Sequence, residues 1–250
     1  MADRLPIKLG KEPLVDAIFE FRFSSAIPAA AVLPGILYGR LSGFSQFQEL
    51  PQAQIPKPVR ESDPFLANAP ILTTEWRNFH INIGDSVLSI SNKYPYQGWS
   101  SFKPAIMEIA NTLADYDFIQ TLNRFSIKYI DIFDKSLIPQ NTTALNMNLA
   151  IANHSIVNET MQFRVEIPRD GFIHAVQVIS SANATLPNGK TFNGLLIDVD
   201  TIANLPPGTH FRKAMENFET SVESIHTSNK SVFFDCLTEQ TLELLEPKYA

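Results

Sequence analysis

The stretch EPLVDAIFEFRF, residues 12–23, decides the fold class of this chain. Apolar side chains at positions 17, 19, 21 and 23 alternate with Ile18, Glu20 and Arg22. Successive side chains of a β-strand point to opposite faces, so the alternation predicts a strand with one apolar face. We expect the phenylalanines to enter the core and Glu20 and Arg22 to stand together on the other face.

A second strand of this kind, RFSIKYIDIFD at 124–134, places Phe125, Ile127 and Tyr129 on one face. Between the two strands, apolar spacing predicts a helix near 28–42 and three short strands within 71–92. An amphipathic helix with Ser101 as its N-cap should follow those strands. The proline-rich stretch at 47–65 reads as a loop or an edge strand.

The second half repeats this order. MQFRVEIP, FIHAVQVIS and TFNGLLIDVD predict three further strands, with turns at 169–171 and 187–189. A short helix is expected near 142–151. A long helix should open at Thr209, because apolar residues recur at spacings of four and three up to Cys236. Thr238 should cap a last short helix.

These elements predict an α+β protein of two tandem strand–helix–antiparallel sheet–helix units, at residues 1–120 and 121–250, or one continuous domain. Their order resembles the fold of the TATA-box-binding protein. It equally resembles the helix-grip arrangement, in which a long C-terminal helix packs on a curved sheet. Both alternatives remain open, and neither implies a function.

Composition limits the function classes. The 250 residues carry a net charge of −6, which disfavours binding to nucleic acid, because phosphates attract basic surfaces. One cysteine, Cys236, excludes a disulfide framework, and we expect it to be a buried, inert thiol. We expect a cytoplasmic protein, since neither a signal peptide nor a membrane-length apolar run is visible.

Two local motifs favour ordinary structure over chemistry. ATLPNGKT at 184–191 matches a permissive phosphate-loop pattern, but a strand follows it and Asn188-Gly189 favours a hairpin turn. Asp198 and Asp200 would share one strand face, and their spacing is that of a polar sheet face. No histidine or carboxylate stands at a recognised metal-ligand spacing, so we expect neither a metal nor a cofactor.

The segments PLVDAIFEFRF, RFSIKYIDIF and H-x6-FFDCLTEQTLELLEP together resemble a sporadically distributed bacterial family of uncharacterised proteins of about this length. Its members open with a PLVEAIFE-like strand and close with a histidine-containing helix and a threonine-led helix. In the opening motif, Asp16 stands where glutamate is usual; in the middle one, Lys128 replaces arginine and Asp131 replaces asparagine. The resemblance implies kinship and transfers no catalytic residue.

Three functions follow as hypotheses. The leading one is a non-enzymatic protein-interaction scaffold, part of a bacterial defence or toxin-neutralising system, whose partner is another protein encoded nearby or a second copy of the chain. The alternatives are a small-ligand-binding or hydrolytic protein with a pocket between the sheet and the C-terminal helix, and nucleic-acid binding across a saddle-like sheet. The candidate polar face or pocket comprises Glu20, Arg22, Lys128, Tyr129, Asp131, Glu166 and His226.

Overall fold

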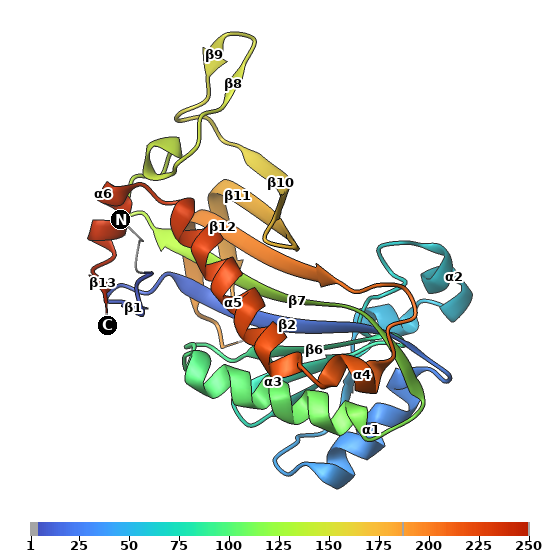
Figure 1. The fold of residues 1–250 in the computed structure, drawn as a ribbon. Helices are drawn as coiled ribbons and strands as arrows, with labels where there is room; N and C mark the ends of the chain where they lie inside the picture. Colours follow the sequence, from blue (N-terminus) through green and yellow to red (C-terminus); the bar gives the residue numbers. More distant parts are fainter. Residues whose placement is uncertain (1–4, 187, 250) are drawn as a thin grey trace. The chain divides into compact units, whose positions relative to one another are not determined.

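A computed structural model describes residues 5–186 and 188–249 and shows an α+β protein with a large antiparallel sheet (Figure 1). The chain forms two compact units that interleave along the sequence. Unit 1 comprises Met1–Val15, Lys128–Thr201 and Ile225–Ala250; unit 2 comprises Asp16–Ile127 and Ile202–Ser224. The predicted halves, 1–120 and 121–250, cut the chain at other points. Among the described helices, none is long and apolar enough to cross a membrane.

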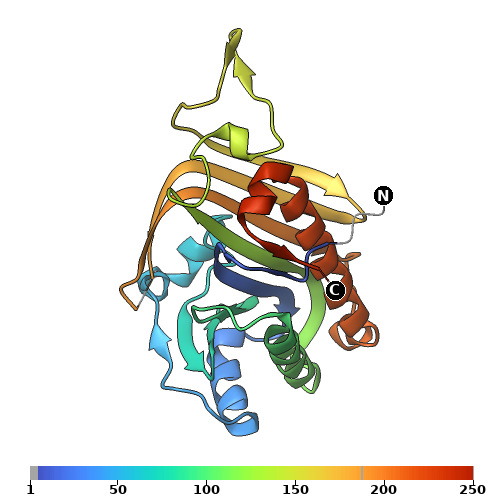
Figure 2. The same ribbon diagram turned by 90° about the vertical axis from the view of Figure 1, so that its left-hand side faces the viewer.

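Four elements contribute to both units: β2 (Leu14–Ser25), β7 (Ile119–Asp134), β12 (Thr191–Asn204) and α5 (Phe218–Asp235). The other elements of unit 2 are α1 (Ala29–Arg40), β3 (Gln48–Glu49), η1 (Pro51–Gln54), α2 (Lys57–Ser62), β4 (Leu72–Trp76), β5 (Phe79–Ile83), β6 (Val87–Asn92), α3 (Trp99–Ala114) and α4 (Phe211–Met215). In unit 2 the strand order is β7-β2-β6-β5-β4-β3. Helices α1 and α3 lie on one face of this sheet (Figure 2).

The predicted opening strand is confirmed as β2, and its phenylalanines are buried as expected. Phe19 and Phe21 are fully buried on β2, and both contact Phe218 at the start of α5, with ring centroids 6.1 and 5.6 Å apart. Phe125 of β7 stacks on Phe19 and meets Phe218 edge to face. Period-two alternation therefore directs an aromatic cluster toward the helices and leaves Glu20 on the opposite face.

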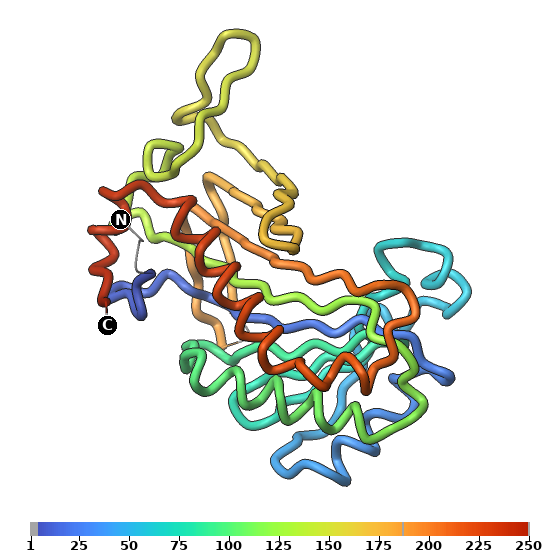
Figure 3. Tube along the Cα trace, in the orientation of Figure 1, coloured from blue at the N-terminus to red at the C-terminus, as the bar shows by residue number. Residues whose placement is uncertain are grey.

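The remaining elements of unit 1 are β1 (Lys8–Leu9), η2 (Thr142–Ala144), β8 (Ala150–Ile151), β9 (His154–Ser155), β10 (Gln162–Arg169), β11 (Phe172–Thr185), α6 (Glu239–Leu244) and β13 (Pro247–Lys248). The strand order here is β10-β11-β12-β7. Strands β1 and β13 pair, so the first and last described segments lie side by side (Figure 3). The β8–β9 hairpin projects from the rest of this unit (Figure 1).

Residues 225–235 of α5 cover one face of the sheet of unit 1. Val232 belongs to the same core cluster as Leu195, Ile197 and Val199 of β12, and Phe233 stacks on Phe133 of β7. A Cβ atom at Gly194 would stand 1.8 Å from the carbonyl oxygen of Phe133, so only glycine permits this approach between β12 and β7.

Several helix predictions need correction. The helix expected to open at Thr209 is two helices, α4 and α5, and the N-cap of α4 is His210. Helix α3 begins at Trp99 with Gly98 as its N-cap, before the expected Ser101. The short helix expected near 142–151 is a single 3₁₀ turn. Apolar spacing reports a buried stripe but not where a helix starts or breaks. The cap at Thr238 is confirmed, because its side chain accepts from the Thr241 N–H.

Because Phe218 contacts Phe19, Phe21 and Phe125, we expect its truncation to destabilise the protein. Phe218→Ala should lower the free energy of unfolding by about 3–5 kcal/mol, because it removes a buried ring and leaves a cavity. Phe65→Ala, at a side chain that is 91% exposed, should change it by less than about 0.5 kcal/mol. Urea denaturation of both variants measures the difference, and equal losses would contradict this account of the core.

Candidate functional site

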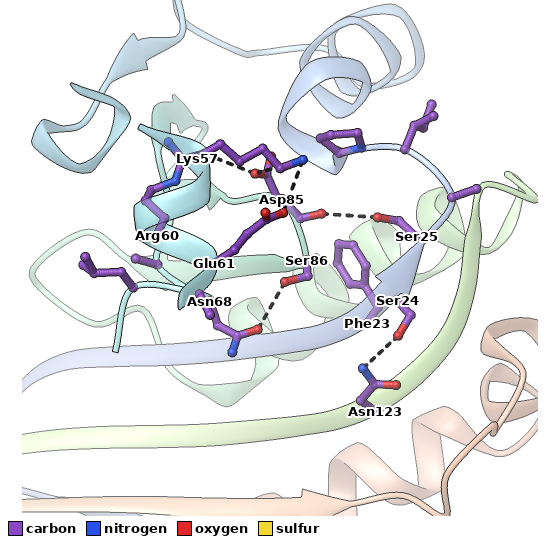
Figure 4. Close-up of a pocket in the computed structure, with 16 residues that line it drawn as sticks. Phe23, Ser24, Ser25, Lys57, Arg60, Glu61, Asn68, Asp85, Ser86 and Asn123 are labelled. Carbon is purple, nitrogen blue, oxygen red and sulfur yellow. Dashed lines mark hydrogen bonds and ion pairs between the residues drawn. The ribbon is translucent and has the colours of Figure 1, made fainter. Parts of the chain in front are cut away.

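A polar pocket of about 450 Å³ opens in unit 2 (Figure 4). Three segments line it: the end of β2 with the following loop, helix α2 with residues 66–69, and the turn between β5 and β6. Asn123 of β7 completes the wall. A pocket of this volume lies within the range that holds small organic ligands.

The charged groups of the pocket come from α2 and the β5–β6 turn. The Arg60 guanidinium donates to the carbonyl oxygen of Ile55 at 2.8 Å and to Asp85 Oδ2 at 3.1 Å. Its side chain is only 11% exposed, so these bonds fix it in the wall. Lys57 Nζ lies 4.0 Å from the same Asp85 oxygen and 3.6 Å from Glu61 Oε1. Both distances exceed ordinary hydrogen bonds, which leaves the ammonium able to turn toward a ligand.

Neutral groups supply the rest of the lining. Ser86 Oγ donates to Asn68 Oδ1 at 3.1 Å, and Asn123 Nδ2 donates to Ser24 Oγ at 3.2 Å. Ser25 Oγ donates to the backbone oxygen of Asp85 at 3.2 Å. These bonds hold hydroxyl and amide groups in fixed positions around the space (Figure 4). The pocket therefore presents donors and acceptors together.

Sequence reasoning did not find this pocket, because its key helix lies in the stretch expected as a loop or edge strand. Two signals for α2 are present: Pro58 in the first turn, and Lys57 and Glu61 at i, i+4 spacing. Gly84 supplies the close approach that the pocket wall needs. A Cβ atom there would stand 2.6 Å from the carbonyl oxygen of Ala69.

Glu20 and Arg22, the two predicted site residues of unit 2, do stand together. Arg22 Nε donates to Glu20 Oε1 at 2.7 Å, and Arg124 Nη2 reaches the same oxygen at 3.2 Å. One carboxylate thus holds two guanidinium groups on the face opposite the aromatic cluster. None of the three lines the pocket described above.

The other predicted site residues belong to unit 1, where they divide between the two faces of its sheet. On the face away from α5, Lys128 Nζ lies 2.7 Å from Asp198 Oδ2, and Glu166 pairs with Arg164 on the same strand at 2.9 Å. The polar sheet face predicted for Asp198 is confirmed. Burial raises the pKa of Asp198, and the nearby Lys128 ammonium opposes that rise.

On the face covered by α5, Tyr129 Oη and His226 Nδ1 are joined by a hydrogen bond of 3.0 Å. Asp131 follows Tyr129 on the same face of β7 and is 4% exposed. Burial raises the pKa of Asp131 well above its ordinary value, and the charges of Glu12 and Asp198 raise it further. The Asp131 carboxyl is therefore neutral over a wider pH range than an exposed aspartate.

A second buried polar group lies further along α5. Asn229 is fully buried, and its Nδ2 donates to the carbonyl oxygen of Val199 at 2.8 Å and to Thr201 Oγ1 at 2.9 Å. The Thr201 hydroxyl also bonds His174 Nδ1 at 2.9 Å, and Ser228 Oγ lies 3.3 Å from His174 Nε2. Burial lowers the pKa of His174, which favours the neutral imidazole. This network joins α5 to the strands in one register, which is a structural role.

Two other sequence features have the structure predicted for them. Strand β11 ends at Thr185 and β12 begins at Thr191, so the hairpin predicted over 184–191 is confirmed; Pro187 lies outside the described residues. Cys236 packs against the core of unit 1, and burial raises its thiol pKa to about 11, as an inert thiol requires. The described residues hold no group of three or more histidine, cysteine or acidic side chains suited to a metal ion.

No protein-family model matches the chain, and no curated protein sequence matches it.

Titration of Asp131 gives a direct test of its environment. Below its ordinary pKa of 3.8 the carboxyl is protonated in both states; above it the unfolded chain releases the proton while the folded protein keeps it. Folding therefore loses stability as the pH rises toward the elevated pKa. Asp131→Asn cannot ionise, so its free energy of unfolding should fall less than that of the wild type as the pH rises from about 4 toward the raised pKa of Asp131.

Asp134→Asn, three residues along the same strand, is the matched control. Hydrogen bonds from Ser136 lower the pKa of Asp134, so its removal should cost stability above pH 4, in the opposite direction. Chemical denaturation at several pH values measures both variants. A loss of stability in Asp131→Asn that grows with pH would show that the Asp131 carboxylate is charged and paired.

Proposed function

We propose that this protein binds a small, electrically neutral, hydroxyl-rich molecule in the pocket of unit 2. The observation behind this proposal is that the positive and negative charges of the pocket lining are equal in number. Two cations, Lys57 and Arg60, face two carboxylates, Glu61 and Asp85, among fixed hydroxyl and amide groups. An anion would meet both carboxylates, and an apolar ligand would leave the polar groups without partners at a cost of ~1–3 kcal/mol each.

A thermal-shift screen tests this function. Neutral sugars and polyols should raise the melting temperature, whereas inorganic phosphate and aliphatic carboxylates should not. A ligand at one hundred times its dissociation constant stabilises by about 2.7 kcal/mol, which corresponds to a shift of about 5–10 °C for a chain of this size. A screen in which only anions produce a shift would contradict the proposal.

Asn68→Leu keeps the approximate side-chain volume but removes the amide that bonds Ser86, so it should abolish the shift. Asn111→Leu is the matched control, because Asn111 is exposed on α3 and lies outside the pocket lining. Isothermal titration of both variants with the best compound separates lost binding from lost folding. Equal affinities in the two variants would place the ligand elsewhere.

The protein-interaction function remains a second proposal, with a partner encoded nearby in a bacterial defence or toxin-neutralising system. It is supported by unit 1, where strand β10 and the β8–β9 hairpin are largely exposed and Ile151 is 63% exposed. Nucleic-acid binding draws no support from the open face of unit 2, where Glu20 already holds Arg22 and Arg124. The tandem arrangement and kinship with the uncharacterised bacterial family also remain proposals.

A further inference from the structure

Strand β10 lies at an edge of the sheet of unit 1. Within the described residues, β11 is the one strand that pairs with β10, so β10 is the edge strand of unit 1. Its last four residues are all exposed, as are two of its first four, Gln162 and Arg164, and Ile167 is 40% exposed. An edge strand presents a row of backbone donors and acceptors that another strand can pair with.

Hydrogen-bond alternation tells which backbone groups face outward. Met161 exchanges bonds with Ser180 of β11: its carbonyl oxygen accepts at 3.1 Å and its N–H donates to Ser180 Oγ at 2.9 Å. In an antiparallel pair such positions alternate, so residues 161, 163, 165 and 167 turn their backbone groups to β11. Residues 162, 164, 166 and 168 turn theirs outward. Pro168, which has no N–H, thus sits where β11 requires none.

The side chains of β10 are symmetric about Val165. Phe163 and Val165 pack against the core of unit 1, on the face that α5 covers, and Ile167 follows them in register. Arg164 and Glu166 stand on the opposite face, one residue to either side of Val165, with side chains that are about half exposed. The pattern of apolar and charged side chains is therefore the same on both sides of Val165, except that the charge is positive on one side and negative on the other.

We propose that two copies of this chain pair through β10, antiparallel about a two-fold axis at Val165. In that register Arg164 stands across from Glu166 of the second copy, and Phe163 across from Ile167. The outward backbone groups of Arg164 and Glu166 then meet in the closely bonded pairs that an antiparallel ladder requires. The apolar row continues across the axis. Arg164 and Glu166, which pair with each other within one copy at 2.9 Å, each gain a second partner of opposite sign from the other copy.

A second copy is favoured over an unrelated strand because the complementarity is internal to β10. A two-fold axis makes the same patch serve both subunits, so the patch must complement itself. The charges of β10 meet that requirement only in the register centred on Val165. This inference concerns unit 1 and is independent of the ligand pocket of unit 2, so either can fail alone.

Charge variants test the pairing. Arg164→Glu should place like charges at both contacts and weaken dimerisation about 10- to 30-fold, and Glu166→Arg should do the same. The double variant Arg164→Glu/Glu166→Arg restores opposite charges and should dimerise as the wild type does. Analytical ultracentrifugation over a concentration series measures each constant, and circular dichroism confirms that the variants fold.

A mixture of the two single variants gives the decisive result. Each alone should dimerise about 10- to 30-fold more weakly than the wild type, yet together they place two glutamates across from two arginines and should form a heterodimer about as tightly as the wild type dimerises. A wild type that stays monomeric throughout the series would overturn the proposal. So would a dimer that the single variants do not weaken, or a mixture of them that does not associate.

Discussion

Alternation of side chains along the strands is the constraint on which the rest of the structure depends. Because β2 turns Phe19 and Phe21 to one side, it has to turn Glu20 and Arg22 to the other. In unit 2 the aromatic side is closed by α1, α3 and the start of α5. In unit 1, residues 225–235 of α5 cover one face of the sheet. Polar chemistry is thereby confined to the open faces, the strand ends and the edges.

The helix-covered face of unit 1 departs from this division in an informative way. Asn229, His174 and Thr201 are fully buried and bonded to one another or to backbone, so their desolvation is offset. For Asp131, burial raises the pKa of the carboxyl, and the protonated form costs less to desolvate than the carboxylate. Such groups define one register of α5 on the strands, because a slip of the helix would leave them buried without partners. The raised pKa of Asp131 and the lowered pKa of His174 both follow from burial first, so neither shift by itself indicates catalysis.

The sequence predicted the strands far better than the site. The alternation in EPLVDAIFEFRF and RFSIKYIDIF identified β2 and β7 and their buried rings, since period two leaves a strong pattern over a few residues. Breaks in helices were missed because the spacing of four and three continues through the gap between α4 and α5. Of the predicted site residues, Glu20 with Arg22 and Tyr129 with His226 do meet. Lys128 and Glu166 instead pair with Asp198 and Arg164, which only the register of the strands reveals.

The pocket and the edge strand differ in how each could have been foreseen. The pocket is lined by Lys57, Asp85 and Asn123, which come from segments far apart in the sequence. The close approach of Gly84 to Ala69 produces no repeating pattern of apolar residues from which the pocket could be predicted. The symmetric pattern of β10, in contrast, is visible in the sequence QFRVEIP. It indicates pairing with a second copy only once the structure shows that β10 is an edge strand. In a central strand, Arg164 and Glu166 would be satisfied by neighbours on both sides. At an edge the outward backbone groups have only water or another strand as partners, and the arrangement of these two charges determines which strand that can be.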